Sequence, residues 1–297
     1  MKLTFFNGVE EIGGNQILLE EKGTKIFLDF GLPFNKYYKF FAEFLSPRVS
    51  LGILDPIEFL LIPPIEGIYR EEFIIEEEIL EKIRSSPFYK KIENLDGVFL
   101  SHAHLDHSGS IFYLRKEIPI FTTLCTAFIL KTIQDTGGKE FCYLSSKIFE
   151  KREDGRQIIK TKSDFQIQRQ FYILDQKEIK KDQKDFWDQI LKKTKAELIR
   201  SELKIWNGKI GNLNCQFFPL DHSIFGAGAL AIETNSGWVI YTGDWRLHGK
   251  FGKLTEKFIQ EVKQLKPLAL ITEGTNILKE KSVSEEEVFF NCLKAVK

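Results

Sequence analysis

Residues Leu100 to Gly109 read Leu-Ser-His-Ala-His-Leu-Asp-His-Ser-Gly. This stretch brings His102, His104, Asp106 and His107 close together, although the whole chain has only 5 histidines. A single histidine is usually a satisfied core or surface residue, but a polar turn or a chance cluster explains this grouping poorly. Neutral imidazole nitrogens and a carboxylate oxygen are the ligands of a borderline divalent cation such as Zn²⁺. The stretch therefore predicts a metal site.

The sequence on both sides of this cluster predicts a loop at the end of a strand. Residues 94–100 run from a turn signal into a short apolar segment, as buried strands do. Residues 108–117 predict a short helix. Open α/β sheets usually place their chemistry on such loops. Residues two apart in an extended loop point the same way, so His102, His104 and Asp106 can converge while His107 points elsewhere. We expect one metal at the two leading histidines and a second at Asp106 and His107.

Length, charge and cysteine content narrow the class of protein. A chain of 297 residues can bury a sizeable core as one large or two modest domains. Lys plus Arg and Asp plus Glu both number 42, so a basic surface for nucleic acid would have to be local. The 4 cysteines are widely spaced, which predicts reduced thiols rather than a disulfide framework. The N-terminus is too short in its apolar part for a signal peptide, and no apolar run reaches about 18 residues. We expect a cytoplasmic protein that has no membrane partner.

The cluster resembles the His-x-His-x-Asp-His signature of the metallo-β-lactamase superfamily, and three further motifs extend the resemblance. Asp29 closes the apolar segment 25–31, at the place of the family's early aspartate. His222 follows a later predicted strand, and Asp244 follows Gly243 after another. The resemblance implies an α/β protein with the four-layer αββα fold. It implies one or two Zn²⁺ ions as cofactor, with Mn²⁺ as the alternative. The implied metal ligands are His102, His104, Asp106, His107, His222 and Asp244.

A segment near the C-terminus narrows the resemblance to one branch of the superfamily. Thr272-Glu273-Gly274-Thr275 follows a predicted strand and is similar to the motif that opens the β-CASP branch. That branch acts on nucleic acids and includes ribonuclease J and the mRNA 3′-end processing nucleases. Glu273 matches the acidic position, whereas Gly274 stands where serine is commoner. The resemblance implies a hydrolase that cuts RNA, or another single-stranded nucleic acid, with a metal-activated hydroxide.

The resemblance also suggests what individual residues do. Asp29, Asp106 and Glu273 form the expected catalytic set. Asp29 would hold a metal ligand or the hydroxide in place, and Glu273 would act in the substrate pocket or as a proton relay. Arg246 and His248 are candidates for substrate contacts, with a structural role as the favoured alternative for His248.

We expect residues 1–270 to form a metallo-β-lactamase-like catalytic domain and residues 271–297 to begin a β-CASP-like domain. The first 30 residues predict a three-stranded meander, and the segments of about 32–95 and about 140–210 are expected insertions. Phe34 to Phe44 in the first insertion could stack bases, but core packing explains an aromatic stretch better. The second insertion is rich in lysine, including Lys192 and Lys193, and is the one candidate for a basic surface. A solvated hairpin and helix explain the same lysines.

The chain departs from the β-CASP pattern after its last predicted helix. The branch continues and then returns with further histidines, whereas no histidine follows His248 here. The resemblance therefore leaves the side of Asp106 and His107 one histidine short, and the C-terminal part is expected to be missing. Two other functions stay open: a thioester or lactone hydrolase of the same fold, and an inactive fragment or half of a split enzyme. A complementary chain and a homo-oligomer are both open as partners.

Overall fold

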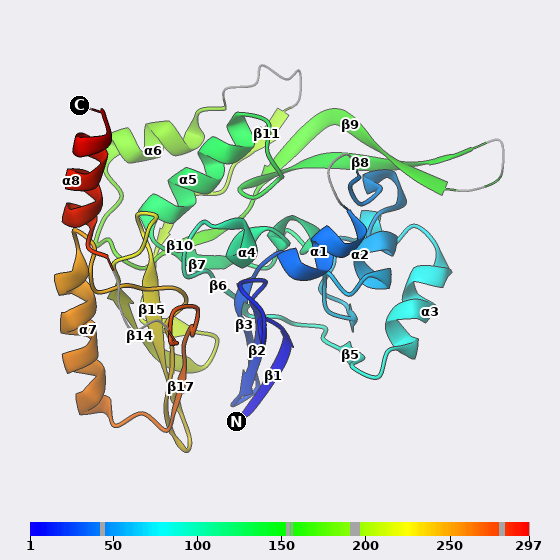
Figure 1. The fold of residues 1–297 in the computed structure, drawn as a ribbon. Helices are drawn as coiled ribbons and strands as arrows, with labels where there is room; N and C mark the ends of the chain where they lie inside the picture. The colour runs from blue at the N-terminus through cyan, green and yellow to red at the C-terminus, as the bar shows by residue number, and fades with distance from the viewer. Residues whose placement is uncertain (42–44, 153–154, 156, 191–196, 279–282, 297) are drawn as a thin grey trace.

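The computed structural model describes residues 1–41, 45–152, 155, 157–190, 197–278 and 283–296. Within these residues the chain forms two β-sheets that pack against each other and are flanked by helices (Figure 1). Phe44 of the aromatic stretch and the pair Lys192 and Lys193 lie outside the described residues.

The first sheet contains seven strands of the described chain in the order β1-β2-β3-β6-β7-β10-β12. The predicted meander is confirmed, because β1, β2 and β3 are antiparallel neighbours. From β3 onward the neighbouring strands run parallel, so that β3, β6 and β7 end at the same edge. The strands are β1 (Lys2–Asn7), β2 (Gln16–Glu21), β3 (Thr24–Phe30), β6 (Gly97–Phe99), β7 (Ile120–Thr122), β10 (Phe171–Ile173) and β12 (Lys204–Ile205).

The second sheet has the order β13-β14-β15-β16-β17. β15 is antiparallel to both β14 and β16, and β17 is parallel to β16. It follows that β14, β16 and β17 also end at one common edge. The strands are β13 (Lys209–Ile210), β14 (Leu213–Pro219), β15 (Gly228–Thr234), β16 (Gly237–Tyr241) and β17 (Ala269–Ile271).

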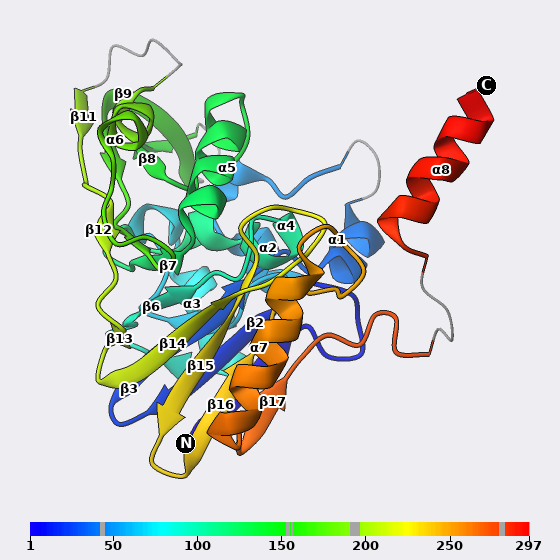
Figure 2. The same ribbon diagram turned by 90° about the vertical axis from the view of Figure 1, so that its left-hand side faces the viewer.

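Successive side chains of a strand point to opposite faces of its sheet, so they belong to different layers of the hydrophobic core. Ile17 and Leu19 of β2 point between the sheets and belong to one cluster with Leu230 of the second sheet. Leu18, which lies between them, faces the helices on the other side. The outer face of the second sheet packs against Phe258 of α7 (Gly252–Leu265), the helix that covers this sheet in Figure 2. The order helix, sheet, sheet, helix is the predicted four-layer α/β fold.

Helices and turns cover the outer face of the first sheet. Buried apolar side chains of α2, α3, η3 and α5 form one cluster with those of the strands. The helices and 3₁₀ turns between β3 and β12 have the following bounds: α1 (Phe34–Phe40), η1 (Val49–Leu51), α2 (Leu54–Glu58), η2 (Glu71–Phe73), α3 (Glu77–Ser85), α4 (Leu105–Ser108), η3 (Ile111–Tyr113), α5 (Leu124–Asp135) and α6 (Lys181–Asp188).

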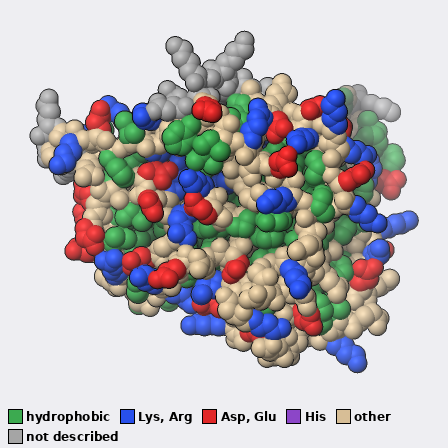
Figure 3. Space-filling view, turned by 180° about the vertical axis from the view of Figure 1, so that it is seen from behind, with side chains coloured by type: hydrophobic (Ala, Val, Ile, Leu, Met, Phe, Trp, Pro, Cys, Tyr) green, Lys and Arg blue, Asp and Glu red, His purple; other side chains and the backbone are tan. Residues whose placement is uncertain are grey.

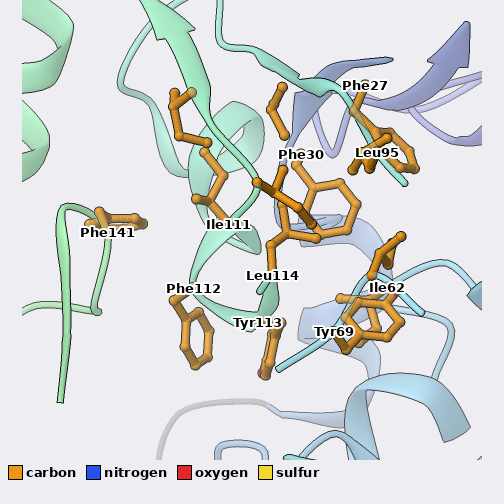
Figure 4. Packing of buried hydrophobic residues seen from close by; sticks show 14 of the residues in the cluster. Phe27, Phe30, Ile62, Tyr69, Leu95, Ile111, Phe112, Tyr113, Leu114 and Phe141 are labelled. Atoms are coloured by element: carbon orange, nitrogen blue, oxygen red, sulfur yellow. The ribbon is translucent and has the colours of Figure 1, made fainter. Parts of the chain in front are cut away.

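The helix predicted over residues 108–117 is wrong in extent. α4 already ends at Ser108, and η3 is a single short turn after which Leu114 is extended. Ile111 and Leu114 are fully enclosed between the strands and the segment that carries Tyr69 (Figure 4). The apolar residues of this segment are therefore fixed by core packing, and no continuous helical face is needed.

Three further parts complete the described fold. β8 (Tyr143–Lys151), β9 (Gln157–Gln168) and β11 (Glu197–Ile199) form a small sheet whose long β8–β9 hairpin extends to one side in Figure 1. β4 (Ile65–Glu66) pairs with β5 (Lys90–Lys91). α8 (Glu285–Val296) stands apart from the sheets in Figure 2. No helix in the described part of the chain combines the length and apolar character needed to cross a membrane.

Phe27 is expected to contribute strongly to stability. Its side chain is 0% exposed, and its ring centroid lies 4.9 Å from that of Phe30. Phe27→Ala should lower the free energy of unfolding by about 3–5 kcal/mol, because it removes buried apolar area and leaves a cavity. Urea unfolding followed by circular dichroism measures this loss. Phe5→Ala is the control, since Phe5 is 45% exposed on β1. Equal losses for the two variants would contradict the packing described here.

Candidate metal centre

The ends of strands from both sheets bring the predicted site residues to one place. Asp29 lies near the end of β3, and the histidine-rich loop follows the neighbouring β6. In the second sheet His222 follows β14, Asp244 follows β16 and Glu273 follows β17. Because the parallel strands of each sheet end at a common edge, residues from five segments meet there.

Three histidines form the first part of the site. Nδ1 of His104 lies 3.0 Å from Nε2 of His102 and 3.3 Å from Nε2 of His222. Nitrogen ligands lie about 2.0–2.1 Å from zinc, which places neighbouring tetrahedral ligands a little over about 3 Å apart. The three ring nitrogens thus have the spacing of ligands around one divalent cation.

His107, Asp244 and Asp106 form the second part. Nε2 of His107 lies 3.3 Å from Oδ1 of Asp244 and 3.8 Å from Oδ2 of Asp106. This nitrogen is buried and has no hydrogen-bond partner within the described chain. The other oxygen of Asp244, Oδ2, lies 3.7 Å from His222 of the first part. A buried nitrogen without a partner costs free energy unless it binds something. The ligand atoms of His102, His107 and Asp244 lie within 4.8 Å of one another, so this group fits a cation as well. Asp244 joins the two parts.

Asp29 lies beneath the cluster and is 0% exposed. Its Oδ1 accepts a hydrogen bond from the backbone N–H of Ser101 at 2.7 Å. Its Oδ2 accepts from the hydroxyls of Ser101 at 2.7 Å and Tyr241 at 2.6 Å, and from Nδ1 of His107 at 2.6 Å. With both oxygens occupied inside the protein, the placement favours the first of its two predicted roles, which is to hold a ligand.

These contacts also set which ring nitrogens carry protons. Nδ1 of His107 donates to Asp29, so the lone pair of the neutral imidazole lies on Nε2. The Ser101 hydroxyl donates to Asp29 as well, so its oxygen can accept from Nδ1 of His102, 3.0 Å away. Nε2 of His102 is then free in the same way. One buried carboxylate therefore orients an imidazole in each part of the site.

Burial and charge shift the pKa values of the histidines in two directions. Burial lowers the pKa of His102 far below its ordinary range and that of His222 to about 4. Both imidazoles are therefore neutral near pH 7, which is the form that binds metal. Burial acts the same way on His107, but the carboxylates of Asp29 and Asp244 outweigh it and raise its pKa to about 10.

Sequence reasoning missed a glycine loop that holds Asp106. Gly13 and Gly14 lie between β1 and β2. The backbone N–H groups of Gly14 and Asn15 donate to the carbonyl of Asp106 at 2.8 and 3.1 Å. Gly13 has a φ of +69°, and a Cβ at this position would lie 2.1 Å from Oδ2 of Asp106. Two consecutive glycines before a buried strand are the signal of such close backbone approach.

Gly13→Ala is therefore expected to displace the Asp106 carboxylate. The matched control is Gly23→Ala, because Gly23 also has a positive φ but nothing lies within 4 Å of its Cβ position. Both variants should lose about 1 kcal/mol of stability from backbone strain. Only Gly13→Ala should also bind zinc or manganese more weakly, as measured by calorimetric titration. Identical metal binding by the two variants would show that this loop does not support the site.

Glu273 lies at the far side of Asp244. Its carboxylate accepts a hydrogen bond from the backbone N–H of Trp245 at 2.9 Å. Together with Asp244 it lines a cavity of about 650 Å³ between residues 8–17 and residues 270–275. The structure thus places Glu273 where it holds the loop that carries Asp244.

Arg246 and His248, the two predicted substrate contacts, have different surroundings in the structure. The Arg246 guanidinium is directed to Asp221 at 3.3 Å and to Glu285 at 2.7 Å. Asp221 is 2% exposed, and its Oδ2 also accepts from the backbone N–H of Phe251. His248 is exposed and, in the described part of the chain, forms no hydrogen bond or ion pair with the cluster. Arg246 is thus tied to the residue that precedes His222, and His248 is not part of the cluster.

The fold gathers histidines and aspartates at the ends of its strands, in groups that could hold a metal ion. The family model of the metallo-beta-lactamase superfamily matches residues 73–123, which contain the cluster from His102 to His107. Over this segment the chain is thus similar to the metallo-beta-lactamase superfamily.

Known proteins resemble the chain over different lengths. Ribonuclease J of Helicobacter pylori (strain ATCC 700392 / 26695) is 22% identical over 249 residues, which cover 83% of this chain and 23% of that protein. The Probable RNase MJ4 of Methanocaldococcus jannaschii is 40% identical over 45 residues, or 14% of this chain and 10% of its own. A solved structure of a protein of unknown function from Enterococcus faecalis V583 has a TM-score of 0.60 and 25% identity. The match covers 99% of this chain and 56% of that one. The chain thus spans less than a quarter of ribonuclease J and about half of the solved structure.

Proposed function

We propose that the chain carries the catalytic centre of a metal-dependent ribonuclease that hydrolyses single-stranded RNA. The observation that carries this proposal is that the Asp244 carboxylate lies between the two groups of candidate ligands. Its two oxygens lie 3.7 Å from His222 in one part and 3.3 Å from His107 in the other. Two adjacent cations suit the in-line displacement of a phosphodiester oxygen. Similarity to ribonuclease J over most of the chain supports RNA as the substrate.

Each part of the site would hold one ion. The chemistry that bound divalent ions supply is a coordinated water of lowered pKa and polarisation of the phosphoryl oxygen. Imidazole and carboxylate donors suit Zn²⁺, with Mn²⁺ as the alternative. Asp29 would keep His102 and His107 in the required tautomers, and Glu273 would hold the loop of Asp244. The proposed ligands are His102, His104 and His222 for one ion, Asp106 and His107 for the other, and Asp244 between them.

The distribution of charge supports a site at which the ions, rather than a broad basic surface, bind the phosphate. Lys plus Arg balance Asp plus Glu over the chain. On the face seen in Figure 3, basic side chains are interspersed with acidic and apolar ones. Clustered cations are what sequence-independent phosphate binding requires. We therefore expect RNA affinity to depend strongly on the loaded metal.

We further propose that the catalytic domain spans residues 1–270 and that residues 271–297 begin a β-CASP-like domain. α8 carries exposed apolar side chains, including Phe289 at 58% and Phe290 at 52% exposure. Its first residue, Glu285, accepts from the Arg246 guanidinium and from the backbone N–H of Lys250 at 2.8 Å. An apolar helix held at one end suits packing against further chain.

A cleavage assay with three substrates tests the proposed function. The purified chain is loaded with Zn²⁺ or Mn²⁺ and incubated with a labelled single-stranded RNA, a thioester and a lactone. We expect metal-dependent cleavage of the RNA that a chelator stops. Hydrolysis of the thioester or lactone without RNA cleavage would contradict the proposal. RNA cleavage only after addition of a second chain with further histidines would instead identify half of a split enzyme.

A further inference from the structure

Tyr241 connects the two sheets directly beneath the metal site. It is the last residue of β16 and is 2% exposed. Its hydroxyl donates to Oδ2 of Asp29 on β3, at a distance of 2.6 Å. Its ring packs edge-on against Phe99 at 6.2 Å between centroids, within the apolar layer between the sheets. A buried hydroxyl at this place is costly unless it is bonded, so this contact is specific.

The other donors to Asp29 come from a different part of the chain. Ser101 and His107 both lie on the loop after β6 of the first sheet. They fix the carboxylate relative to that loop but not relative to the second sheet. Within the described residues, Tyr241 is the donor to Asp29 that belongs to the second sheet. It also lies three residues before Asp244 on the same segment.

We infer that Tyr241 is a positioning residue of the metal centre. By bonding Asp29, its hydroxyl fixes the carboxylate that orients His102 and His107 and aligns this loop with Asp244. The inference rests on the proposed metal site. It concerns metal binding itself, so it is tested without RNA.

The test compares two Tyr→Phe variants that each remove one buried hydroxyl. Tyr241→Phe keeps the ring against Phe99 and removes the bond to Asp29. Tyr143→Phe is the matched control, because its buried hydroxyl donates to the buried Asp135 at 2.7 Å. Asp135 belongs to α5 and is paired with Lys131. Both variants lose a hydrogen bond of the same kind, so a purely structural effect would appear equally in their unfolding temperatures.

Zinc affinity is measured by titrating the metal-free chains in competition with a chromogenic chelator. The visible absorption spectrum of the Co²⁺-loaded chain reports the geometry of the ligands. We expect Tyr241→Phe to bind zinc about 10–100-fold more weakly and to change the Co²⁺ spectrum, since partners that orient metal ligands have effects of this size. Tyr143→Phe should match the parent in both. Parent-like affinity and spectrum for Tyr241→Phe would overturn the inference, as would an equal weakening in Tyr143→Phe. A parent chain that binds no metal would overturn the proposed function itself.

Discussion

His104→Ala is expected to abolish RNA cleavage and to remove the stabilisation that zinc gives the chain. Nδ1 of His104 lies between Nε2 of His102 and Nε2 of His222, at 3.0 and 3.3 Å. Without it the first part of the site keeps two imidazoles. A ligand present at a hundredfold excess over its Kd raises the free energy of unfolding by about 2.7 kcal/mol. Thermal unfolding with and without zinc measures this gain directly.

Cys125→Ala is the control for the His104 variant. Cys125 is an exposed thiol and a residue type that also binds zinc. This variant should keep both the zinc-dependent rise in Tm and the cleavage rate of the parent. A His104→Ala chain that cleaves RNA at the parent rate would contradict the assignment of this cluster as the catalytic centre.

Asp29→Ala is expected to destabilise the chain and to eliminate tight metal binding. The carboxylate is fully buried and accepts four hydrogen bonds, so its loss leaves buried donors without partners. Asp29 also has a φ of +57°, a conformation that aspartate tolerates better than alanine. Removing one partner from a buried charged network costs about 3–5 kcal/mol. Urea unfolding gives this loss, and titration of the metal-free chain gives the metal affinity.

Asp55→Ala is the control that separates the loss of stability from the loss of metal binding. Asp55 lies on α2 and is 4% exposed, and its carboxylate forms an ion pair with the Arg48 guanidinium at 2.5 Å. Its removal should also lower the free energy of unfolding, but zinc affinity should remain that of the parent. Loss of metal binding in both variants would show that Asp29 acts through general stability rather than through the histidines.

The resemblance of the motifs to a known superfamily was enough to predict the fold class, and local sequence predicted the strand ends at which the site lies. The run from His102 to His107 follows a short buried strand, as expected, and Asp29, His222 and Asp244 each follow or close another. The ends of strands can be predicted because turn residues and apolar alternation are encoded within a few neighbouring residues.

Contacts between distant segments could not be predicted in this way. Tyr241 and Asp29 are 212 residues apart, and their bond exists only because the two sheets pack face to face. The approach of Gly13 to Asp106 likewise depends on how the β1–β2 loop meets α4. The apolar residues 111–114 suggested a helix, yet burial between the sheet and neighbouring turns determines their conformation.

The ligand environment of bound zinc tests the central claim most directly. The chain is loaded with one equivalent of Zn²⁺, and X-ray absorption at the zinc edge is recorded in solution. We predict nitrogen and oxygen neighbours at about 2.0–2.1 Å, with the scattering pattern of imidazole rings from His102, His104 and His222. Sulfur neighbours at about 2.3 Å would place the ion on cysteines instead. That result, or the absence of imidazole scattering, would contradict the assignment of the histidine cluster as the metal centre.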